Sequence, residues 1–209
     1  MNQNVENPQE EGSKQEVSLE ALKAGDMAEF ARLVDIYSNS IYRVALKILN
    51  DPQDAEDVLQ ETFIKALRAL PSFEGRSSLS TWLYRIAVNE ALMLVRKRRT
   101  NFVSIDADRD DEEGEAEPAE IVDWCCLPEG DLLNAEARQF LNAAVQRLSP
   151  ALRAVFVLRD LEGLSVKETA DALNLTETAV KTRLLRARLK LREELSVYYA
   201  ERMAERFSK

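Results

Sequence analysis

The sequence predicts an all-helical protein made of two small domains that an acidic segment joins. Apolar residues recur at helical spacing along most of the chain, strand-like alternation is almost absent, and the 209 residues include only six glycines and six prolines. The charge is segregated: residues 104–136 carry thirteen acids and one base, whereas 21–103 and 137–209 carry net charges of +2 and +5. An apolar content of 45% is enough to build a core in each half.

The composition excludes several kinds of site. The chain has no histidine, and its only cysteines are the neighbours Cys125 and Cys126, so we expect no metal, no cofactor and no Cys/His catalysis. A structural or incidental role for the two cysteines and a role in redox sensing both stay open. No apolar run approaches the roughly 20 residues of a membrane span and the N-terminus is polar, so we expect a cytoplasmic protein without membrane insertion.

The first half of the chain is expected to form four helices. Residues 1–17 are too polar to fold and are predicted to be a disordered tail. The predicted helices cover 18–24, 26–49, 52–70 and 78–99. The third is expected to bury an apolar stripe that includes Leu67. Its opposite face presents Asp57, Gln60, Glu61 and Ile64.

A possible surface for single-stranded nucleic acid follows the third helix. The loop 72–77 leads to Ser78, the expected cap of a helix that ends in the basic cluster 96–99. Near the loop lie Trp82, Tyr84 and Asn89, and a stripe of the same helix carries Arg85 and Arg96. Aromatic rings stack on bases, an amide can bind a base edge, and arginines track phosphates. The alternative for Trp82 is a place in the core.

The segment 164–195 predicts a helix-turn-helix. Ser165 and Glu168 form a capping box, Asn174 suits the left-handed end of a short helix, and Thr176 suits the N-cap of the next. The second helix has a narrow apolar seam from Val180 to Leu195. Its other side presents Thr178, Lys181, Thr182, Arg183, Leu185 and Arg186. From 178 to 192 there are six bases and no acid, which suits a helix in the major groove of DNA. The alternative is that these charges only solvate a helical hairpin.

Three stretches together resemble a bacterial sigma factor of the extracytoplasmic-function (ECF), RpoE-type group. They read DAEDVLQETFIKAL (54–67), SFEGRSSLSTWLYRIAVNEALMLVRKRR (72–99) and LSPALRAVFVLRDLEGLSVKETADALNLTETAVKTRLLRARLKLREEL (148–195). The resemblance implies a sigma-2 domain over 18–100, an acidic linker over 101–134 and a sigma-4 domain over 135–209. The C-terminal helical extension after Leu195 has no counterpart that we can assign in the family. The resemblance also implies that the protein is not an enzyme and directs transcription initiation, under the control of an anti-sigma factor.

The same resemblance assigns roles to individual residues. Contacts to core RNA polymerase, at the β′ clamp helices, fall to Asp57, Gln60, Glu61 and Ile64. Capture of a base of the −10 promoter element falls to Phe73, Arg76, Ser77, Ser78, Trp82, Arg85, Asn89 and Arg96. Contacts to the −35 element fall to Thr178, Lys181, Thr182, Arg183, Leu185 and Arg186. A further contact of the sigma-4 domain with the β flap of polymerase is expected, and the free protein is expected to be a monomer.

Two other functions are compatible with parts of the sequence. A one-component helix-turn-helix repressor would form homodimers on a palindrome and bind DNA without polymerase. An enzyme could use the carboxylates Asp54, Glu56 and Asp57, but these acids follow a helix N-terminus, where the helix dipole accounts for them. The acidic linker either restrains the basic recognition helix or acts as a passive spacer, and both readings stay open.

Overall fold

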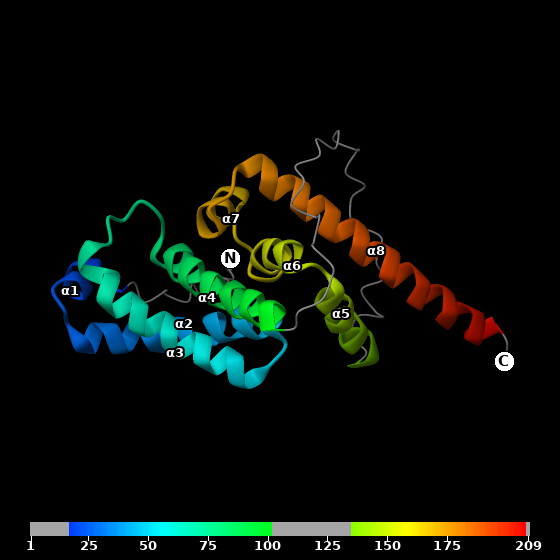
Figure 1. Ribbon diagram of the computed structural model, residues 1–209, viewed down its shortest axis with the longest axis horizontal. Coiled ribbons are helices and arrows are strands. Elements are labelled where there is room, and N and C mark those ends of the chain that lie inside the picture. The colour runs from blue at the N-terminus through cyan, green and yellow to red at the C-terminus, as the bar shows by residue number, and fades with distance from the viewer. Residues whose placement is uncertain (1–16, 102–134, 208–209) are drawn as a thin grey trace, which may run out of the picture.

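The computed structural model describes residues 17–101 and 135–207, and every regular element in these two stretches is helical. In chain order the elements are α1 (Leu19–Lys23), α2 (Met27–Leu49), α3 (Pro52–Ala69), the 3-10 turn η1 (Leu70–Ser72), α4 (Leu79–Asn101), α5 (Ala135–Arg147), α6 (Pro150–Phe156), the π-helical turn η3 (Val157–Leu161), α7 (Val166–Leu173) and α8 (Glu177–Phe207). Figure 1 shows α1–α4 as one bundle beside a second group formed by α5–α8. The all-helical prediction is confirmed for the described residues.

The helices of the first region begin and end where the sequence indicated. Asp26 caps α2 and Asp51 caps α3, each accepting hydrogen bonds from two backbone N–H groups of the first turn. Asn50 ends α2 in the left-handed conformation with φ 56°, which turns the chain directly into α3. At the far end of the bundle, the Glu29 carboxylate accepts the backbone N–H of Ser18 at 2.6 Å and ties the start of α1 to α2.

The helix-turn-helix has the capping that the sequence predicted. Ser165 Oγ accepts the backbone N–H of Glu168 at 3.1 Å, and Glu168 Oε2 accepts that of Ser165 at 2.8 Å, so the capping box is complete. Asn174 ends α7 with φ 53°, and Thr176 Oγ1 caps α8 by accepting the N–H of Ala179 at 3.1 Å. These contacts set the sharp corner between α7 and the recognition helix α8.

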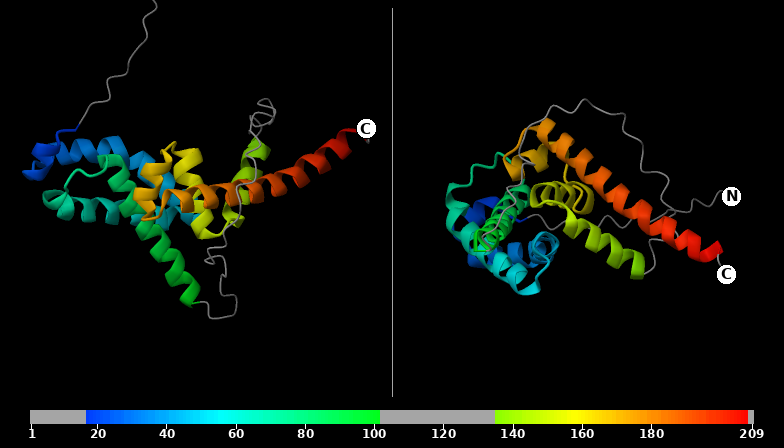
Figure 2. Two further views of the ribbon diagram at one scale, coloured as in Figure 1. Left: turned by 90° about the horizontal axis from the view of Figure 1, so that it is seen from above. Right: turned by 45° about the vertical axis from the view of Figure 1, so that its right-hand side comes forward.

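The two regions pack on each other. One core fills the bundle of α2, α3 and α4, and side chains of the second region extend it: Ala154, Val157, Leu158, Leu164 and Ala172. A second core lies among α5, α6, α7 and α8. The main contact between the regions is that of α7 with α4, while α5, α6 and η3 contact α2. Figure 2 shows the second region beside the bundle from two further directions. The sequence did not predict this docking.

The π-helical turn η3 redirects the chain between α6 and α7. The Glu162 N–H donates to the Val157 carbonyl at 3.0 Å, and Gly163 follows with φ 74°, a conformation that favours glycine. A π-turn inserts a residue relative to the α-helical period and is often found at functional sites. Here it directs Asp160 towards α8 and Glu162 towards α2 and α4.

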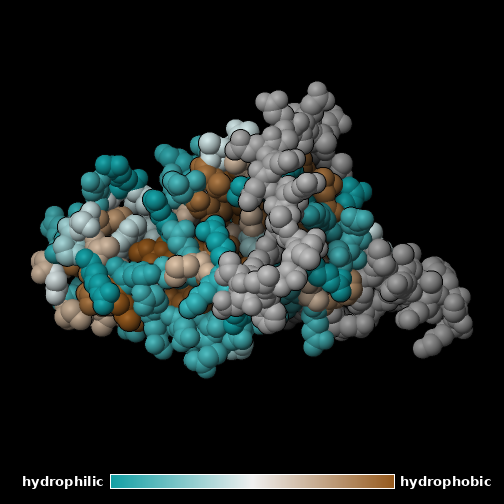
Figure 3. Space-filling model, in the orientation of Figure 1, coloured by the Kyte–Doolittle hydropathy of each residue, from teal (hydrophilic) through white to brown (hydrophobic). Residues whose placement is uncertain are grey.

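One burial prediction is wrong, and others lie beyond the described residues. Leu67 was expected in the core but is 37% exposed, because it is one residue past the buried Ala66 and lies at the margin of the apolar stripe. The predictions for residues 1–16 and 102–134, including Cys125 and Cys126, concern residues outside the described stretches. Within those stretches no helix is long and apolar enough to cross a membrane. In Figure 3, the described part of one face mixes hydrophilic side chains with hydrophobic patches.

Candidate functional site

The recognition helix α8 separates a buried seam from an outward face. Val180, Leu184, Ala187, Leu191 and Leu195 are all buried, as the spacing predicted. Thr178 and Lys181 are exposed; Thr182, Arg183, Leu185 and Arg186 are partly exposed. The six predicted −35 contacts are therefore accessible on the N-terminal half of one helix. Small hydroxyls and basic side chains there fit base edges and phosphates in a major groove.

A basic groove lies next to this outward face. It has a volume of about 310 Å³ and runs between the start of α6, at Ser149 to Leu152, and the α8 residues Arg183, Arg186, Leu189 and Lys190. Three basic side chains line one wall, so the groove extends the positive surface of α8 around the helix. Arg183 and Arg186 therefore belong both to the predicted −35 contacts and to this groove.

Among the six bases between 178 and 192, Arg188 has a structural role. Arg188 donates from Nε to Asp160 Oδ2 at 2.9 Å and from Nη2 to Asp160 Oδ1 at 2.8 Å. A bidentate pair of this geometry is strong and directional. The hydrogen bond with Asp160 raises the pKa of the Arg188 guanidinium further. Arg188 therefore fastens α8 to η3.

The predicted −10 surface is assembled on one side of α4 and on the loop before it. Arg85, Asn89 and Arg96 are exposed on α4, and Trp82 is partly exposed one turn earlier. Ser78 caps α4 by accepting the N–H of Thr81 at 3.1 Å. The loop also carries the exposed Arg76, which pairs with Glu74 at 2.5 Å, and the partly exposed Ser77. The structure thus brings the predicted residues together; their contact with DNA remains a prediction.

The aromatic residues of this surface differ in exposure. Phe73 is only 8% exposed and packs on Trp82, with ring centroids 4.8 Å apart and planes inclined by 41°. Trp82 thus has one contact inside the protein and part of its surface in solvent, so it is neither fully in the core nor fully exposed, and its role in binding a base stays a prediction. Tyr84, which the sequence placed near the loop with the aromatic residues of this surface, is buried and faces the second region instead.

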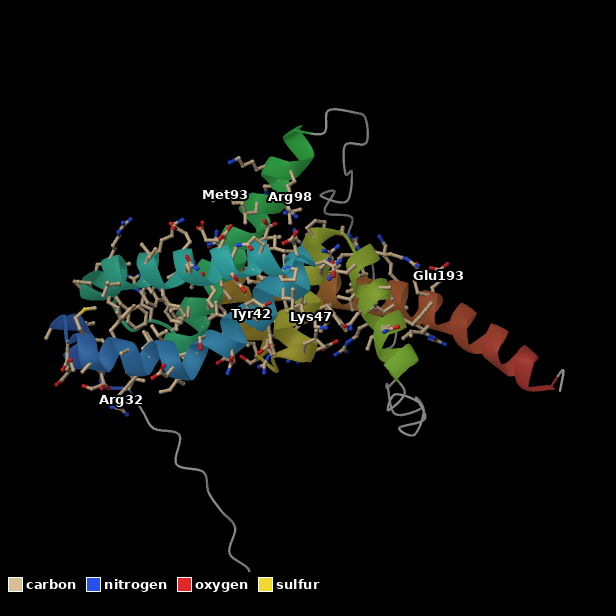
Figure 4. The ribbon with its side chains drawn as sticks, turned by 90° about the horizontal axis from the view of Figure 1, so that it is seen from below. Arg32, Tyr42, Lys47, Met93, Arg98 and Glu193 are labelled. Atoms are coloured by element: carbon tan, nitrogen blue, oxygen red, sulfur yellow. The ribbon has the colours of Figure 1, made fainter. Side chains whose placement is uncertain are left out.

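The basic cluster at the end of α4 is partly neutralised. The Arg98 guanidinium contacts Asp54 and lies 3.7 Å from Asp51. These acids stand at the start of α3, so Arg98 ties the two helices together. Figure 4 shows Met93 and Arg98 on the part of α4 that projects beyond the bundle. Spacing alone does not reveal this pairing, because the acids precede Arg98 by more than forty residues.

An acidic and apolar groove lies between α3 and α4. It measures about 430 Å³ and is lined by Asp57, Val58, Gln60, Glu61, Ile64, Lys65, Glu90, Met93 and Leu94. All four predicted polymerase-binding residues line it. Ile64 and Met93 are 43% and 52% exposed although both helices already bury a complete apolar face. The residues Glu90, Met93 and Leu94 were missed by sequence reasoning, because their place beside α3 depends on how the helices pack.

One lysine bridges the two walls of this α3/α4 groove. Lys65 Nζ lies 2.6 Å from Glu90 Oε1 on α4 and 3.5 Å from Glu61 Oε1 on α3. The hydrogen bond with Glu90 raises the pKa of Lys65, so the ammonium form is favoured. Lys65 therefore links α3 to α4 across the groove and neutralises part of the negative charge of Glu61 and Glu90.

Two family models match separate parts of the chain. The protein-family model described as sigma-70 region 2 matches residues 33–100, and the family model described as sigma-70, region 4 matches residues 140–191. The ECF RNA polymerase sigma factor SigW of Bacillus subtilis is 35% identical over 177 residues, which cover 85% of this chain and 94% of SigW.

Two solved structures share the fold. One is CnrH in complex with the cytosolic domain of CnrY, with a TM-score of 0.61, 26% identity, and coverage of 86% of this chain and 95% of the matched chain. The other is the sigma factor RpoE in complex with the anti-sigma factor NepR from Bartonella quintana, with a TM-score of 0.59, 25% identity, and coverage of 81% and 98%.

A helix-turn-helix docked on a second helical region, both matching sigma-70 models, defines a sigma-70-type transcription initiation factor. Such factors direct initiation and are not themselves enzymes. Within that class the chain belongs to the ECF family of RNA polymerase sigma factors. This membership disfavours the one-component repressor.

Proposed function

We propose that the α3/α4 groove docks the protein on core RNA polymerase. The observation that carries this proposal is the combination of exposed apolar side chains, Ile64 and Met93, with the acids Asp57, Glu61 and Glu90 in one groove. An apolar patch with a charged rim is typical of protein interfaces. Its occupant should be a segment with apolar and basic side chains, which the β′ clamp helices would supply.

The two DNA-binding surfaces then have separate tasks. On α4 and the preceding loop, Trp82, Arg85 and Asn89 would hold an unstacked base of the −10 element, since ring, amide and guanidinium suit the face, edge and phosphate of one nucleotide. On α8, the residues from Thr178 to Arg186 would read the −35 element in the major groove. The sigma-4 region would also contact the β flap of polymerase.

Control by an anti-sigma factor is also proposed. The two solved structures that share this fold hold partners, the cytosolic domain of CnrY and the anti-sigma factor NepR. Both cover more than four fifths of this chain. A protein of the same kind, which binds the free sigma factor, would keep it from polymerase until a signal releases it.

Charge reversal tests the polymerase contact. Asp57→Lys together with Glu61→Lys should weaken association with core RNA polymerase at least about tenfold, because like charges opposed across an interface cost several kcal/mol. The matched control is Glu20→Lys with Asp35→Lys, which makes the same change in net charge at exposed positions on α1 and α2. Circular dichroism should match for both. Equal core affinity for the two double variants would refute docking through this groove.

A further inference from the structure

The basic groove between α6 and α8 has apolar residues in its lining. Ala151 and Leu152 of α6 and Leu189 of α8 contribute them. Leu189 is 51% exposed, although α8 already buries a complete seam of other apolar residues. A phosphate backbone can bind the basic side chains of this groove but gains nothing from its apolar ones. The groove therefore fits a polypeptide that brings apolar side chains of its own.

The charge of the groove selects the kind of polypeptide. Arg183, Arg186 and Lys190 line it, and none of the described residues in its lining is acidic. The α3/α4 groove, in contrast, is lined by three acids and a single lysine. A cleft lined by one sign of charge concentrates the opposite charge within it. An occupant of the basic groove should therefore combine apolar side chains with carboxylates.

A segment of this chain has that combination. Residues 115–131 hold six acids and no base, and in their middle lies the apolar run 121–127, which reads IVDWCCL. We call this run the island. Apolar side chains gain free energy when they leave water, and the acids on both sides of the island favour a basic surface for it.

The island is tethered within reach of the basic groove. Leu127 precedes Ala135, where α5 begins, by eight residues, which span up to about 28 Å. The 13 residues of α5 measure about 20 Å and end at Arg147, two residues before Ser149 at the groove. Eight residues are therefore long enough to run back along α5. A segment tethered in this way has a millimolar effective concentration, well above that of a separate partner in dilute solution.

We propose that the island occupies the basic groove in the free protein and that DNA bound to α8 displaces it. Arg183 and Arg186 belong both to the groove and to the proposed −35 contacts, so carboxylates beside the island and DNA compete for the same guanidinium groups. The competition rests on the proposed function of α8, whereas the seating of the island does not. When the groove is filled in part of the molecules, the apparent Kd for DNA rises by the inverse of the unfilled fraction.

Disulfide trapping in the full-length protein tests the seating, because Cys125 and Cys126 belong to the island. Ala151→Cys on α6 and Leu189→Cys on α8 each place a thiol in the groove. The control, Lys167→Cys, places one at an exposed position of α7 outside it. Under mild oxidation without DNA, the thiols at 151 and 189 should join Cys125 or Cys126 at least about tenfold faster than the thiol at 167.

Equal rates at the three positions would overturn the proposal. Cross-links between two copies of the chain, in place of internal ones, would also overturn it, because the groove would then hold the island of another molecule.

Fluorescence anisotropy with a DNA duplex of random sequence at low salt measures the competition. Trp124→Ala with Val122→Ala removes apolar side chains of the island without changing its charge. This variant should bind DNA about three- to tenfold more tightly, which corresponds to a groove filled in roughly 70–90% of wild-type molecules. The matched control, Phe102→Ala with Val103→Ala, removes an aromatic residue and a valine elsewhere in the same segment and should bind as wild type does.

Equal DNA affinity for the island variant and the wild type would overturn the competition. If the internal cross-links form but no variant binds DNA, the proposed −35 contacts of α8 fail and the seating of the island stands.

Discussion

Arg188 on α8 and Asp160 on η3 share two hydrogen bonds, of 2.9 and 2.8 Å, that fasten the recognition helix to the π-helical turn. Two residues further along, Glu162 contacts Arg43 and Tyr84 of the first region. The same short segment therefore positions the DNA-reading helix and docks the two regions. The sequence alone would assign Arg188 to DNA binding, but its guanidinium is paired with Asp160 within the protein.

Arg188 should not contribute to the salt dependence of DNA binding. Each phosphate contact that is lost reduces the slope of log K against log salt by about 1. Lys181→Gln should show this reduction, whereas Arg188→Gln should leave the slope unchanged and lower the free energy of unfolding by about 1–2 kcal/mol. Fluorescence anisotropy across a salt series and chemical denaturation give the two quantities. A reduced slope for Arg188→Gln would mean that the guanidinium leaves Asp160 to bind phosphate.

Asn89→Ala and Trp82→Ala should affect different steps. Asn89 is exposed on α4, so its truncation opens no cavity and should impair promoter melting at unchanged thermal stability. Trp82 packs on Phe73, and its truncation should cost about 2–4 kcal/mol of folding stability. Permanganate footprinting and thermal melts separate these effects. Equal melting temperatures for both variants would show that the Phe73 contact contributes little and that Trp82 works on DNA alone.

The capping box of α7 should make stability depend on pH. Hydrogen bonding to Ser165 lowers the pKa of Glu168 in the folded protein, so the unfolded chain binds the proton more readily. The resulting stability is present above the unfolded pKa of about 4.3 and is lost as the pH falls through the folded value. Glu168→Gln should therefore reduce the difference in Tm between pH 7 and pH 4. An unchanged difference would show that the carboxylate charge has no role in the cap.

Helix boundaries could be predicted because they depend on local chemistry. The helix ends are set by residues that contact or turn the backbone within a few positions, namely Asn50, Asp51 and the Ser165–Glu168 capping box. The buried seam of α8 follows from the spacing of its apolar residues alone. The outward face of α8 and the four groove residues on α3 could be predicted for the same reason. In contrast, Leu67 lies at the margin of its stripe, where spacing does not decide burial.

The remaining features depend on contacts between distant segments. Arg98 meets Asp54, Arg188 meets Asp160, and Tyr84 meets Glu162 only because the helices pack as they do. No periodic pattern encodes the π-turn either, since its residues continue an apolar helix without a proline or glycine until Gly163. For this reason the sequence predicted two separate domains and did not reveal their docking.

Arg186→Ala should weaken promoter recognition without affecting the polymerase contact. Arg186 belongs to the proposed −35 contacts on α8 and also lines the basic groove, so the loss of a base contact should cost roughly 1–3 kcal/mol in promoter binding. Core polymerase affinity should stay the same, because the α3/α4 groove is untouched. Electrophoretic shifts of the holoenzyme on promoter DNA, at limiting polymerase, provide the measurement. Wild-type affinity for the variant would place the reading surface elsewhere on α8.

Run-off transcription with core RNA polymerase on a genomic DNA library tests the central claim most directly. The account predicts new transcripts only when this protein and core polymerase are both present, with start sites that share one upstream pair of sequence elements at fixed spacing. The Asp57→Lys, Glu61→Lys variant should abolish these transcripts. A transcript profile identical to that of core polymerase alone, together with tight binding of the protein to DNA in the absence of polymerase, would contradict it.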